Sequence, residues 1–389
     1  MKVLLFNTGR FAGAKAGTER VLCNMANVLI DKGYEVVILN YNDNMGEPPY
    51  PLHDKVRIVG AVRGRLSLFE RIRRNLYRKP ADRHAYEYNI LDARRAELFA
   101  PVIAEEAPDI IISYHAAGTR ILQAGRDPGC PVITMFHFNP ETVIKSDDHK
   151  KIIALEQCSR VQVLMESYID GLKKYIKSDN IVHIPNVVPQ FDNIRADFSS
   201  KIIVHVGRFD QKQKRQHLLI EAFAKVAAYD EAWTVEFWGD DGGGTDGYCS
   251  HCRELVKKYG LEDRVKFCGT TAKIIEEMQR GSVYCFPSAY EGFPLAMTEA
   301  MSIGLPVIGY KNCPAVNELV LDGVNGLLCD EGVEPLAEAL SELMQDEAKR
   351  KRYGDNAKQD MKQYAPEVVW DMWDKLIREV VCEYNEQKK

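Results

Sequence analysis

The sequence lacks any long apolar run. Its first residues offer only Val3 to Phe6 before the polar residues 7–10, which is far shorter than the apolar core of a signal peptide. No later stretch reaches the roughly 20 apolar residues that a helix needs to cross a bilayer. We therefore expect a cytoplasmic protein.

The sequence also lacks a strong excess of charge of one sign. Its 389 residues carry a net charge of -5, with 46% apolar and 28% charged residues, which is typical of an ordinary soluble globular protein. This composition excludes a disordered chain and argues against nucleic acid as a partner. Any function that needs positive charge must therefore depend on a local cluster of basic residues.

Patterns that hold metals or disulfides are scarce as well. The ten cysteines are scattered, and several lie inside apolar runs such as 283–286, where a free thiol acts as a small apolar side chain, so disulfides are not expected. Cys249 and Cys252 form a single Cys-x-x-Cys with no second ligand pair, which favours a reduced helix start over a zinc site. The Asp-rich turn at 240–247 lacks the spacing of a calcium loop. We expect no metal.

Short β-branched runs alternate with longer amphipathic stretches along the whole chain, which is the pattern of parallel α/β sheets. The first half contains predicted strands at 3–6, 36–39, 56–59, 110–113, 132–135 and 161–164. The second half contains predicted strands at 202–206, 234–238, 265–268, 283–286 and 307–309. The clearest helix is Glu19 to Lys32, which Gly33 ends.

The length of the chain favours two domains. A polar stretch before the strand at 202 places the boundary near residue 190, so we predict domains at 1–190 and 191–365. A final helix at 366–389 carries an apolar stripe that includes Trp370 and Trp373, and such a stripe needs a partner surface. A surface or dimer helix is the alternative.

The stretch 287–301 follows an apolar strand and enters a helix, so it lies at the carboxyl end of a strand, where doubly wound sheets bind ligands. Gly292 permits a tight turn, and the amides of residues 293–296 favour an anion such as a diphosphate. Glu299 can accept hydrogen bonds from ribose hydroxyls, and Glu291 can accept them from the hydroxyls of a sugar. An isolated pair of this kind is more often a solvated loop acid and a helix-start acid.

The Glu-x7-Glu spacing around Gly-Phe-Pro resembles the nucleotide-sugar motif of the retaining glycosyltransferases of family four, which include many lipopolysaccharide and capsule enzymes. The resemblance implies the GT-B fold, an α/β class in which two Rossmann-like doubly wound parallel-sheet domains face a cleft. The second domain would hold the donor, the first domain would form the acceptor side, and the final helix would pack back on the first domain. The implied donor-binding residues of this motif are Glu291, Gly292, Phe293, Pro294, Leu295 and Glu299.

A second match to the family is Gly207-Arg208 followed by Lys214, ahead of a predicted helix. The resemblance implies that Arg208 and Lys214 neutralise the diphosphate leaving group, whose negative charge grows as the glycosidic bond breaks. Such a site can dispense with a metal, and no Asp-x-Asp pair lies beside the motif. Lys212 or Arg215 could take the place of Lys214.

A third match lies in the first domain, where 16–20 looks like the Gly-Gly-x-Glu-Arg loop of the family with Ala16 in place of the first glycine. Amides of Gly17 and Thr18 could approach the donor phosphates, while acceptor contacts or a plain strand-to-helix turn are alternatives. His137, at the end of a strand, resembles the histidine beside the transferred sugar, and His115 ends a neighbouring strand. A hydrogen-bonded structural histidine is the alternative for both.

A basic stretch at 63–83 also contains Phe69, Ile72 and Leu76 on one helical face. It resembles the interfacial helices by which many GT-B enzymes reach lipid-linked acceptors, since basic side chains attract anionic lipid while an apolar face inserts. Peripheral contact with the inner face of the cell membrane is therefore a hypothesis. A solvated helix whose apolar edge packs on the domain is the alternative, and a basic acceptor-binding surface is another.

Together these matches imply a metal-independent glycosyltransferase with catalytic residues Glu291, His137, Arg208 and Lys214. It would move a hexose or N-acetylhexosamine from a nucleotide-diphosphate sugar, with UDP favoured over GDP, to a glycan or lipid-linked acceptor in cell-surface polysaccharide synthesis. The donor is a co-substrate, and no cofactor is expected. The alternatives are a nucleotide-sugar-binding protein without transferase activity and a GT-B epimerase.

Overall fold

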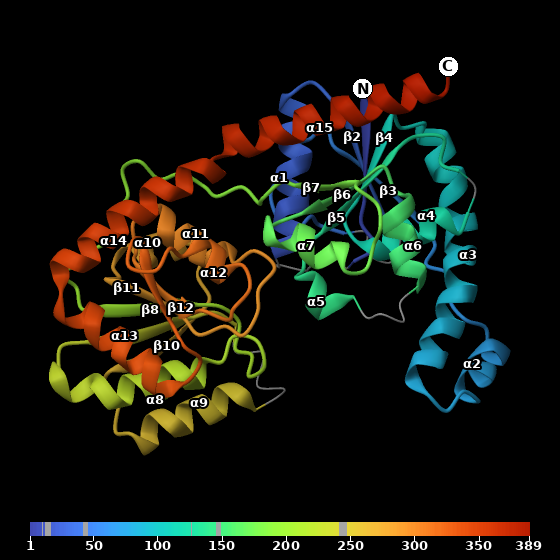
Figure 1. The fold of residues 1–389 in the computed structure, drawn as a ribbon. Helices are drawn as coiled ribbons and strands as arrows, with labels where there is room; N and C mark the ends of the chain where they lie inside the picture. Colours follow the sequence, from blue (N-terminus) through green and yellow to red (C-terminus); the bar gives the residue numbers. More distant parts are fainter. Residues whose placement is uncertain (10, 12–16, 42–45, 126, 145–148, 241–246) are drawn as a thin grey trace. The chain divides into compact units, whose positions relative to one another are not determined.

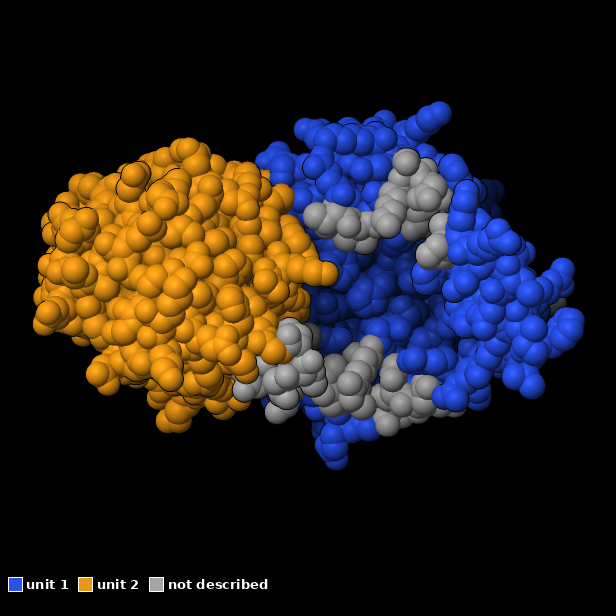
Figure 2. Space-filling model, turned by 90° about the horizontal axis from the view of Figure 1, so that it is seen from below, with its two compact units in different colours: residues 1–184, 370–389 blue, residues 185–369 orange. Residues whose placement is uncertain are grey.

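The computed structural model describes residues 1–9, 11, 17–41, 46–125, 127–144, 149–240 and 247–389, without the side chains of residues 80, 81, 142 and 143. The chain forms two compact units (Figures 1 and 2). Unit 1 contains Met1–Ile184 and Trp370–Lys389, and unit 2 contains Pro185–Val369.

Unit 1 is built on a parallel sheet with the strand order β3-β2-β1-β4-β5-β6-β7. Its strands are β1 Lys2–Phe6, β2 Glu35–Tyr41, β3 Arg57–Ala61, β4 Ile110–Ser113, β5 Val132–Phe136, β6 Arg160–Val163 and β7 Ile181–His183. Its helices are α1 Gly17–Asp31, α2 Leu68–Asn75, α3 Pro80–Glu106, α4 Ala116–Gln123, α5 Pro140–Val143, α6 His149–Gln157 and α7 Ser167–Lys173.

Unit 2 is built on a second parallel sheet with the order β10-β9-β8-β11-β12-β13. Its strands are β8 Ile202–Val206, β9 Thr234–Trp238, β10 Val265–Gly269, β11 Val283–Phe286, β12 Val307–Tyr310 and β13 Gly326–Cys329. Its α-helices are α8 Gln216–Val226, α9 Tyr248–Lys258, α10 Ile274–Gln279, α11 Leu295–Ser302, α12 Val316–Leu319, α13 Val333–Gln345 and α14 Glu347–Asp360. The described residues of unit 2 also form 3₁₀ turns at Ala227–Tyr229 and Met361–Tyr364.

Central strands of both sheets are buried on both faces, because helices cover each face of a doubly wound sheet. In β1, residues 3–6 are fully buried, and β11 and β12 are buried throughout. This explains why these strands read as continuous apolar runs rather than as alternating patterns. Parallel α/β sheets are therefore confirmed.

Two short strands were missing from the predictions, β7 and β13. β7 contains three half-buried residues, so it has no apolar run. β13 begins at Gly326, where an added Cβ would lie 2.4 Å from the Val307 carbonyl oxygen, so the strand starts with a residue that strands usually avoid. The first helix spans Gly17–Asp31, rather than Glu19 to Lys32.

The final helix, α15 Pro366–Gln387, belongs to unit 1 from Trp370 onward. Trp373, Ile377 and Val380 are buried there. Polar bonds to unit 1 flank this apolar stripe: Lys32 to Asp371 at 2.6 Å, Tyr34 to Asp374 at 2.5 Å, and Arg160 to Glu383 at 2.8 Å. The partner surface of the stripe is therefore a face of unit 1.

Polar side chains link helix α2 to the rest of unit 1. Ser67 and Glu70 form a capping box at its start, Glu70 pairs with Arg94 at 2.8 Å, and Arg74 pairs with Glu87 at 3.1 Å. None of its residues is buried, and Figure 1 shows it beyond the start of α3. The alternative in which its apolar edge packs on the domain is therefore wrong.

Within the described residues, no helix is both long enough and apolar enough to cross a membrane.

Candidate active site

The strand order of unit 2 places two of the predicted motifs at one crevice. From β8 the chain proceeds outward through β9 and β10, whereas β11, β12 and β13 lie on the other side of β8. The loops that leave β8 and β11 therefore diverge, and ligands of doubly wound sheets bind at such a switch point. These loops carry Gly207-Arg208 and residues 287–294.

An ion pair joins the two motifs. Lys214 Nζ lies 2.7 Å from Glu291 Oε1, and the side chains are only 15% and 8% exposed. The same ammonium lies 4.7 Å from the ring centroid of Phe286, at the end of β11. A pair this buried costs several kcal/mol when one partner is lost, about 3–5 kcal/mol, because the other charge stays behind unpaired. The arrangement holds a cation and a carboxylate at the crevice.

The structure also shows which basic residue of the run 211–215 reaches Glu291. Lys212 is exposed, and its amide donates to Asp210 Oδ1 at 3.0 Å. Arg215 adopts the left-handed conformation with φ of 53°, and its Nε donates to the Pro287 carbonyl at 3.0 Å. Its guanidinium pairs with Glu331. Lys214 is therefore the one that faces Glu291.

Arg208 lies at the exposed rim of this crevice. Its side chain is 62% exposed, and Nη2 contacts Asp210 Oδ2 at 3.1 Å and Gln213 Oε1 at 2.8 Å. Burial by itself would raise the pKa of Asp210, but hydrogen bonds from the Gln213 amide and from Arg208 outweigh it and hold that pKa below its usual value. Asp210 is thus an anion that orients Arg208.

Glu299 and Glu291 both lie near the buried Tyr284. Glu299 is 6% exposed and one turn into α11. Burial, mainly, raises the pKa of Tyr284 far above its usual value, and the two carboxylates raise it further. Of the amides expected to be open at the helix start, that of Leu295 donates to the Phe293 carbonyl at 2.9 Å. Phe293 is buried edge-on against Tyr364, with ring centroids 5.9 Å apart.

Two further side chains at this crevice, Asp210 and Gln213, were absent from the predicted site. Gln213 Nε2 contacts the Tyr290 carbonyl at 3.2 Å and Glu291 Oε2 at 3.4 Å, so Gln213 touches both motifs. Asp210 Oδ1 accepts the amide of Lys212 at 3.0 Å, which closes an Asx-type turn, and it also accepts the amide of Gln213 at 2.8 Å. In the sequence, this turn is indicated by Asp210 followed by the polar run 211–215. No local pattern marks Gln213.

In unit 1 the switch point lies between β1 and β4. Three polar residues follow the strands there: Asn7 after β1, His115 after β4 and His137 after β5. His115 and His137 have ring centroids 6.1 Å apart, and His137 stacks on Tyr114 at 5.7 Å. Burial first, and His115 second, lower the pKa of His137 to about 3, so its imidazole is neutral. Within the part of the chain that the structure describes, His137 Nε2 and Asn7 Nδ2 have no hydrogen-bond partner.

The predicted loop at 16–20 is described only in part. Gly17 and Thr18 form the start of α1, which follows β1, so both lie at the carboxyl end of the first strand. Residues 12–16, including Ala16, lie outside the described residues.

Cys249 and Cys252 are buried in the first turns of α9, and neither is in a disulfide bond. None of the ten cysteines, all of which the structure describes, forms a disulfide. Among the described residues, no group of three or more His, Cys, Asp or Glu side chains is arranged to hold a metal ion.

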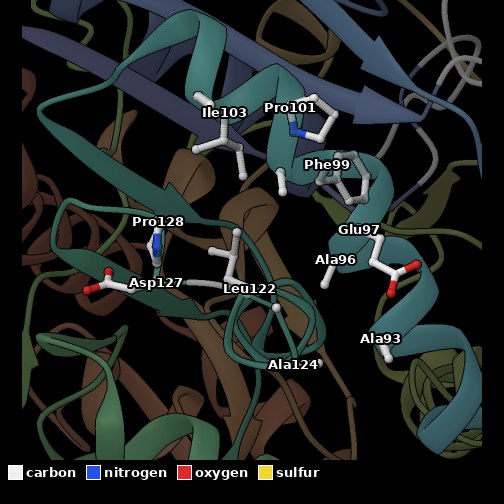
Figure 3. Close-up of a pocket in the computed structure, with 13 residues that line it drawn as sticks. Ala93, Ala96, Glu97, Phe99, Pro101, Ile103, Leu122, Ala124, Asp127 and Pro128 are labelled. Atoms are coloured by element: carbon white, nitrogen blue, oxygen red, sulfur yellow. The ribbon is translucent and has the colours of Figure 1, made fainter.

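A cavity of about 680 Å³ lies in unit 1 between α3 and the end of α4 (Figure 3). Ala96, Phe99 and Leu122 line it, together with the loop through Pro128 that leads into the amino end of β5. It contains none of the predicted site residues, and its lining is mainly apolar. It is therefore separate from the crevice of unit 2.

Comparison with known families gives two matches that together span most of the chain. The model described as Glycosyltransferase Family 4 matches residues 16–189, and the model described as Glycosyl transferases group 1 matches residues 190–360. The boundary between the matches falls close to the start of unit 2.

Individual related proteins share a third or less of their residues with this chain over the aligned regions. The chain is 32% identical over 208 residues to the exopolysaccharide phosphotransferase SCO2592 of Streptomyces coelicolor, over 53% of this chain and 21% of that protein. The chain thus spans about a fifth of the length of that relative. It is 24% identical to the amylovoran biosynthesis glycosyltransferase AmsD of Erwinia amylovora, over 93% of this chain and 95% of that protein.

Among solved structures, Anabaena HepE (Alr3699) in complex with UDP and glucose matches with a TM-score of 0.73 at 19% identity, over 97% of this chain and 100% of that chain. This likeness concerns the fold and, together with the two sheets, confirms the two Rossmann-like units of the GT-B class. With both halves matched by models of one enzyme class, the protein is a glycosyltransferase of family four.

Proposed function

We propose that the protein is a retaining hexosyltransferase that uses a UDP-sugar in cell-surface polysaccharide synthesis. The observation that carries the proposal is the buried contact between Lys214 and Glu291 at the switch point of unit 2, with Arg208 on the adjoining loop. A cation beside a carboxylate suits a donor that combines a diphosphate with a hydroxyl-rich sugar. UDP is favoured because the similar Anabaena protein was solved with UDP and glucose.

In the proposed reaction, the bond between the anomeric carbon and the diphosphate oxygen breaks, and its electron pair stays on that oxygen. Arg208 and Lys214 stabilise this growing charge, so that no metal ion is needed. The acceptor hydroxyl attacks from the same face, its oxygen bonds to the anomeric carbon, and its proton passes to the leaving phosphate. The products are UDP and an α- or β-linked glycoside with the anomeric configuration of the donor.

The remaining residues would orient the donor. Glu291 accepts hydrogen bonds from sugar hydroxyls, Glu299 accepts them from the ribose, and Gly292 lets the chain turn close to the diphosphate. His137 is neutral at physiological pH because its pKa is about 3, so we assign it a hydrogen bond to a sugar hydroxyl and not a charge interaction. Gly17 and Thr18 would contact the donor phosphates from unit 1.

We propose that the acceptor is lipid-linked and that α2 holds the enzyme at an anionic membrane surface. Leu68, Phe69, Ile72 and Leu76 are 55–76% exposed, which is unusual for neighbouring large apolar side chains. The surrounding exposed basic residues are Arg65, Arg71, Arg73, Arg78, Lys79 and Arg83. Each basic residue near an anionic surface contributes about 1 kcal/mol, and the apolar side chains add burial.

A panel of nucleoside diphosphates tests the donor assignment directly. Calorimetry of the purified chain with UDP, GDP and ADP, with and without EDTA, should show tightest binding of UDP and no effect of the chelator. UDP binding that disappears with EDTA would overturn metal independence. Preference for GDP or ADP would overturn the choice of base, and NMR of the product anomeric proton tests retention.

A further inference from the structure

A fully buried histidine and glutamine lie directly beneath the Gly207-Arg208 loop. His205 is on β8, and Gln216 is the first residue of α8; both are 0% exposed. Buried polar side chains persist where their hydrogen bonds are satisfied, since an unpaired group costs about 1–3 kcal/mol. The hydrogen-bond partners of these two side chains therefore indicate their structural role.

The hydrogen bonds run in a fixed direction. His205 Nδ1 lies 2.9 Å from the Cys285 carbonyl oxygen, which can only accept, so Nδ1 carries the proton and Nε2 is an acceptor. Gln216 Nε2 donates to His205 Nε2 at 3.3 Å and to the Arg208 carbonyl at 2.8 Å. The oxygen of the same amide faces the Asp210 amide at 3.4 Å. The histidine nitrogen and the Arg208 carbonyl thus both require the NH₂ group of the glutamine to face them.

The histidine can keep this role only while it is neutral. Burial lowers the pKa of His205 to about 4, although the bond to Cys285 raises it and Lys214 lowers it further. A protonated ring would place an N–H opposite the glutamine NH₂ group. The arrangement is therefore intact at neutral pH.

These bonds fix the loop from below. The Gly207 amide donates to the Trp238 carbonyl and the Phe209 amide to the Asp240 carbonyl, each at 2.9 Å, and the Gln216 side chain holds the Arg208 carbonyl between them. Gly207 lies close to both His205 and Lys214. A Cβ built on it would lie 3.4 Å from His205 Nε2 and 3.5 Å from Lys214 Cδ.

We propose that His205 and Gln216 are positioning residues for donor binding, which hold the Arg208 carbonyl inward so that Arg208 and Lys214 face the diphosphate together. This role rests on the proposed function, since it presumes that the two basic residues bind the donor diphosphate. Neither residue touches the donor. Both act through the shape of the loop.

Gln216→Met tests the role because methionine keeps the volume and removes the amide. The expected result is a folded protein that binds UDP about tenfold more weakly, because one buried carbonyl loses its bond. Gln345→Met is the matched control: Gln345 is exposed on α13 and bonds Ser341 at 2.7 Å, so its loss should leave UDP affinity unchanged. Calorimetry with UDP and thermal unfolding are measured for each.

Gln216→Glu adds a second test, the dependence of UDP affinity on pH. A role in packing alone would not change this dependence. As a carboxylate, the new side chain repels the Arg208 carbonyl oxygen, while as a carboxylic acid it can donate to it. UDP binding relative to wild type should therefore recover as the pH is lowered from 8 to about 5.5, a range in which a buried carboxyl titrates. This comparison uses two states of one folded protein, so it holds even if Gln216→Met does not fold.

The outcomes separate the two proposals. A wild-type chain that binds no nucleoside diphosphate would overturn the proposed function and with it the role of the pair. A wild-type chain that binds UDP, with a folded Gln216→Met variant of equal affinity or a Gln216→Glu variant whose pH profile parallels wild type, would overturn the role of the pair alone.

Discussion

At the residue scale, the crevice of unit 2 depends on charges that neutralise one another. Lys214 and Glu291 are both largely buried, and each would be costly alone. Asp210 and Gln213 add contacts to Arg208. The proposed donor site is therefore assembled by polar bonds within unit 2, and single substitutions should affect both folding and binding.

We predict that Glu291→Ala abolishes sugar transfer and destabilises unit 2 by about 3 kcal/mol while the fold survives, because Lys214 is left without its buried partner. Lys214→Met should cost a similar amount. Urea unfolding and a transfer assay measure the two effects. The double variant is the control: its loss of stability should be smaller than the sum of the single losses, and strict additivity would contradict the coupling.

Two buried histidines predict an acid-sensitive fold. Burial lowers the pKa of His137 to about 3 and that of His205 to about 4. Both lie below the usual value of about 6.5, so the unfolded chain binds these protons first as the pH falls. The free energy of unfolding is therefore highest above about pH 6.5. It falls toward pH 3–4, by up to about 1.4 kcal/mol per pH unit for each histidine.

Unfolding free energies at a series of pH values check this sign. The slope between pH 6.5 and 4 should become shallower in His137→Gln, since the proton bound by His137 no longer distinguishes the folded from the unfolded chain. An unchanged slope would mean that His137 is not buried in its neutral form.

At the element scale, α2 carries large apolar side chains that the described residues of unit 1 leave largely exposed. It is held by ion pairs to α3 and a capping box, and not by burial. A short helix with exposed apolar residues gains little stability from itself in water. Under the proposed membrane contact, the lipid surface would bury these side chains.

We predict that the chain floats with vesicles of phosphatidylglycerol at low salt, and that Phe69→Asp with Leu76→Asp abolishes flotation. Each side chain would lose about 1.5–3 kcal/mol of burial. Tyr229→Asp is the matched control, because Tyr229 is 68% exposed on unit 2, far from the basic residues in sequence. Wild-type protein that stays in the soluble fraction at low salt would sink the idea.

At the scale of the whole molecule, α15 is the element shared by both units. It begins at Pro366 in unit 2 and belongs to unit 1 from Trp370. The stability of unit 1 therefore depends on a segment more than 180 residues away in the chain, since unit 1 otherwise ends at Ile184.

We predict that Trp373→Ala destabilises unit 1 by about 3–5 kcal/mol, because a side chain that is 2% exposed is removed from its core. Hydrogen exchange should rise in the strands of unit 1 and change little in those of unit 2. Val368→Ala is the control on the same helix, since Val368 is 43% exposed. Equal effects of the two variants would contradict the assignment.

Much of this protein was determined by its sequence alone. Strand runs such as Ile202–Val206 and Val283–Phe286 match the structure residue for residue, because strands buried on both faces are mainly apolar, with His205 as a buried polar exception. The positions of Arg208 and Glu291 at strand ends followed from the same local pattern. The family follows from motifs that are contiguous in the chain.

Tertiary structure decided what local patterns leave open. Lys214, rather than its basic neighbours, meets Glu291 because an Asx-type turn at Asp210 and the left-handed backbone at Arg215 set where each side chain points. The exposure of α2 depends on which surfaces unit 1 leaves uncovered. The contact between His205 and Gln216 joins residues that only the folded loop brings together. Spacing along a chain predicts elements and strand ends, whereas side-chain partners depend on long-range packing.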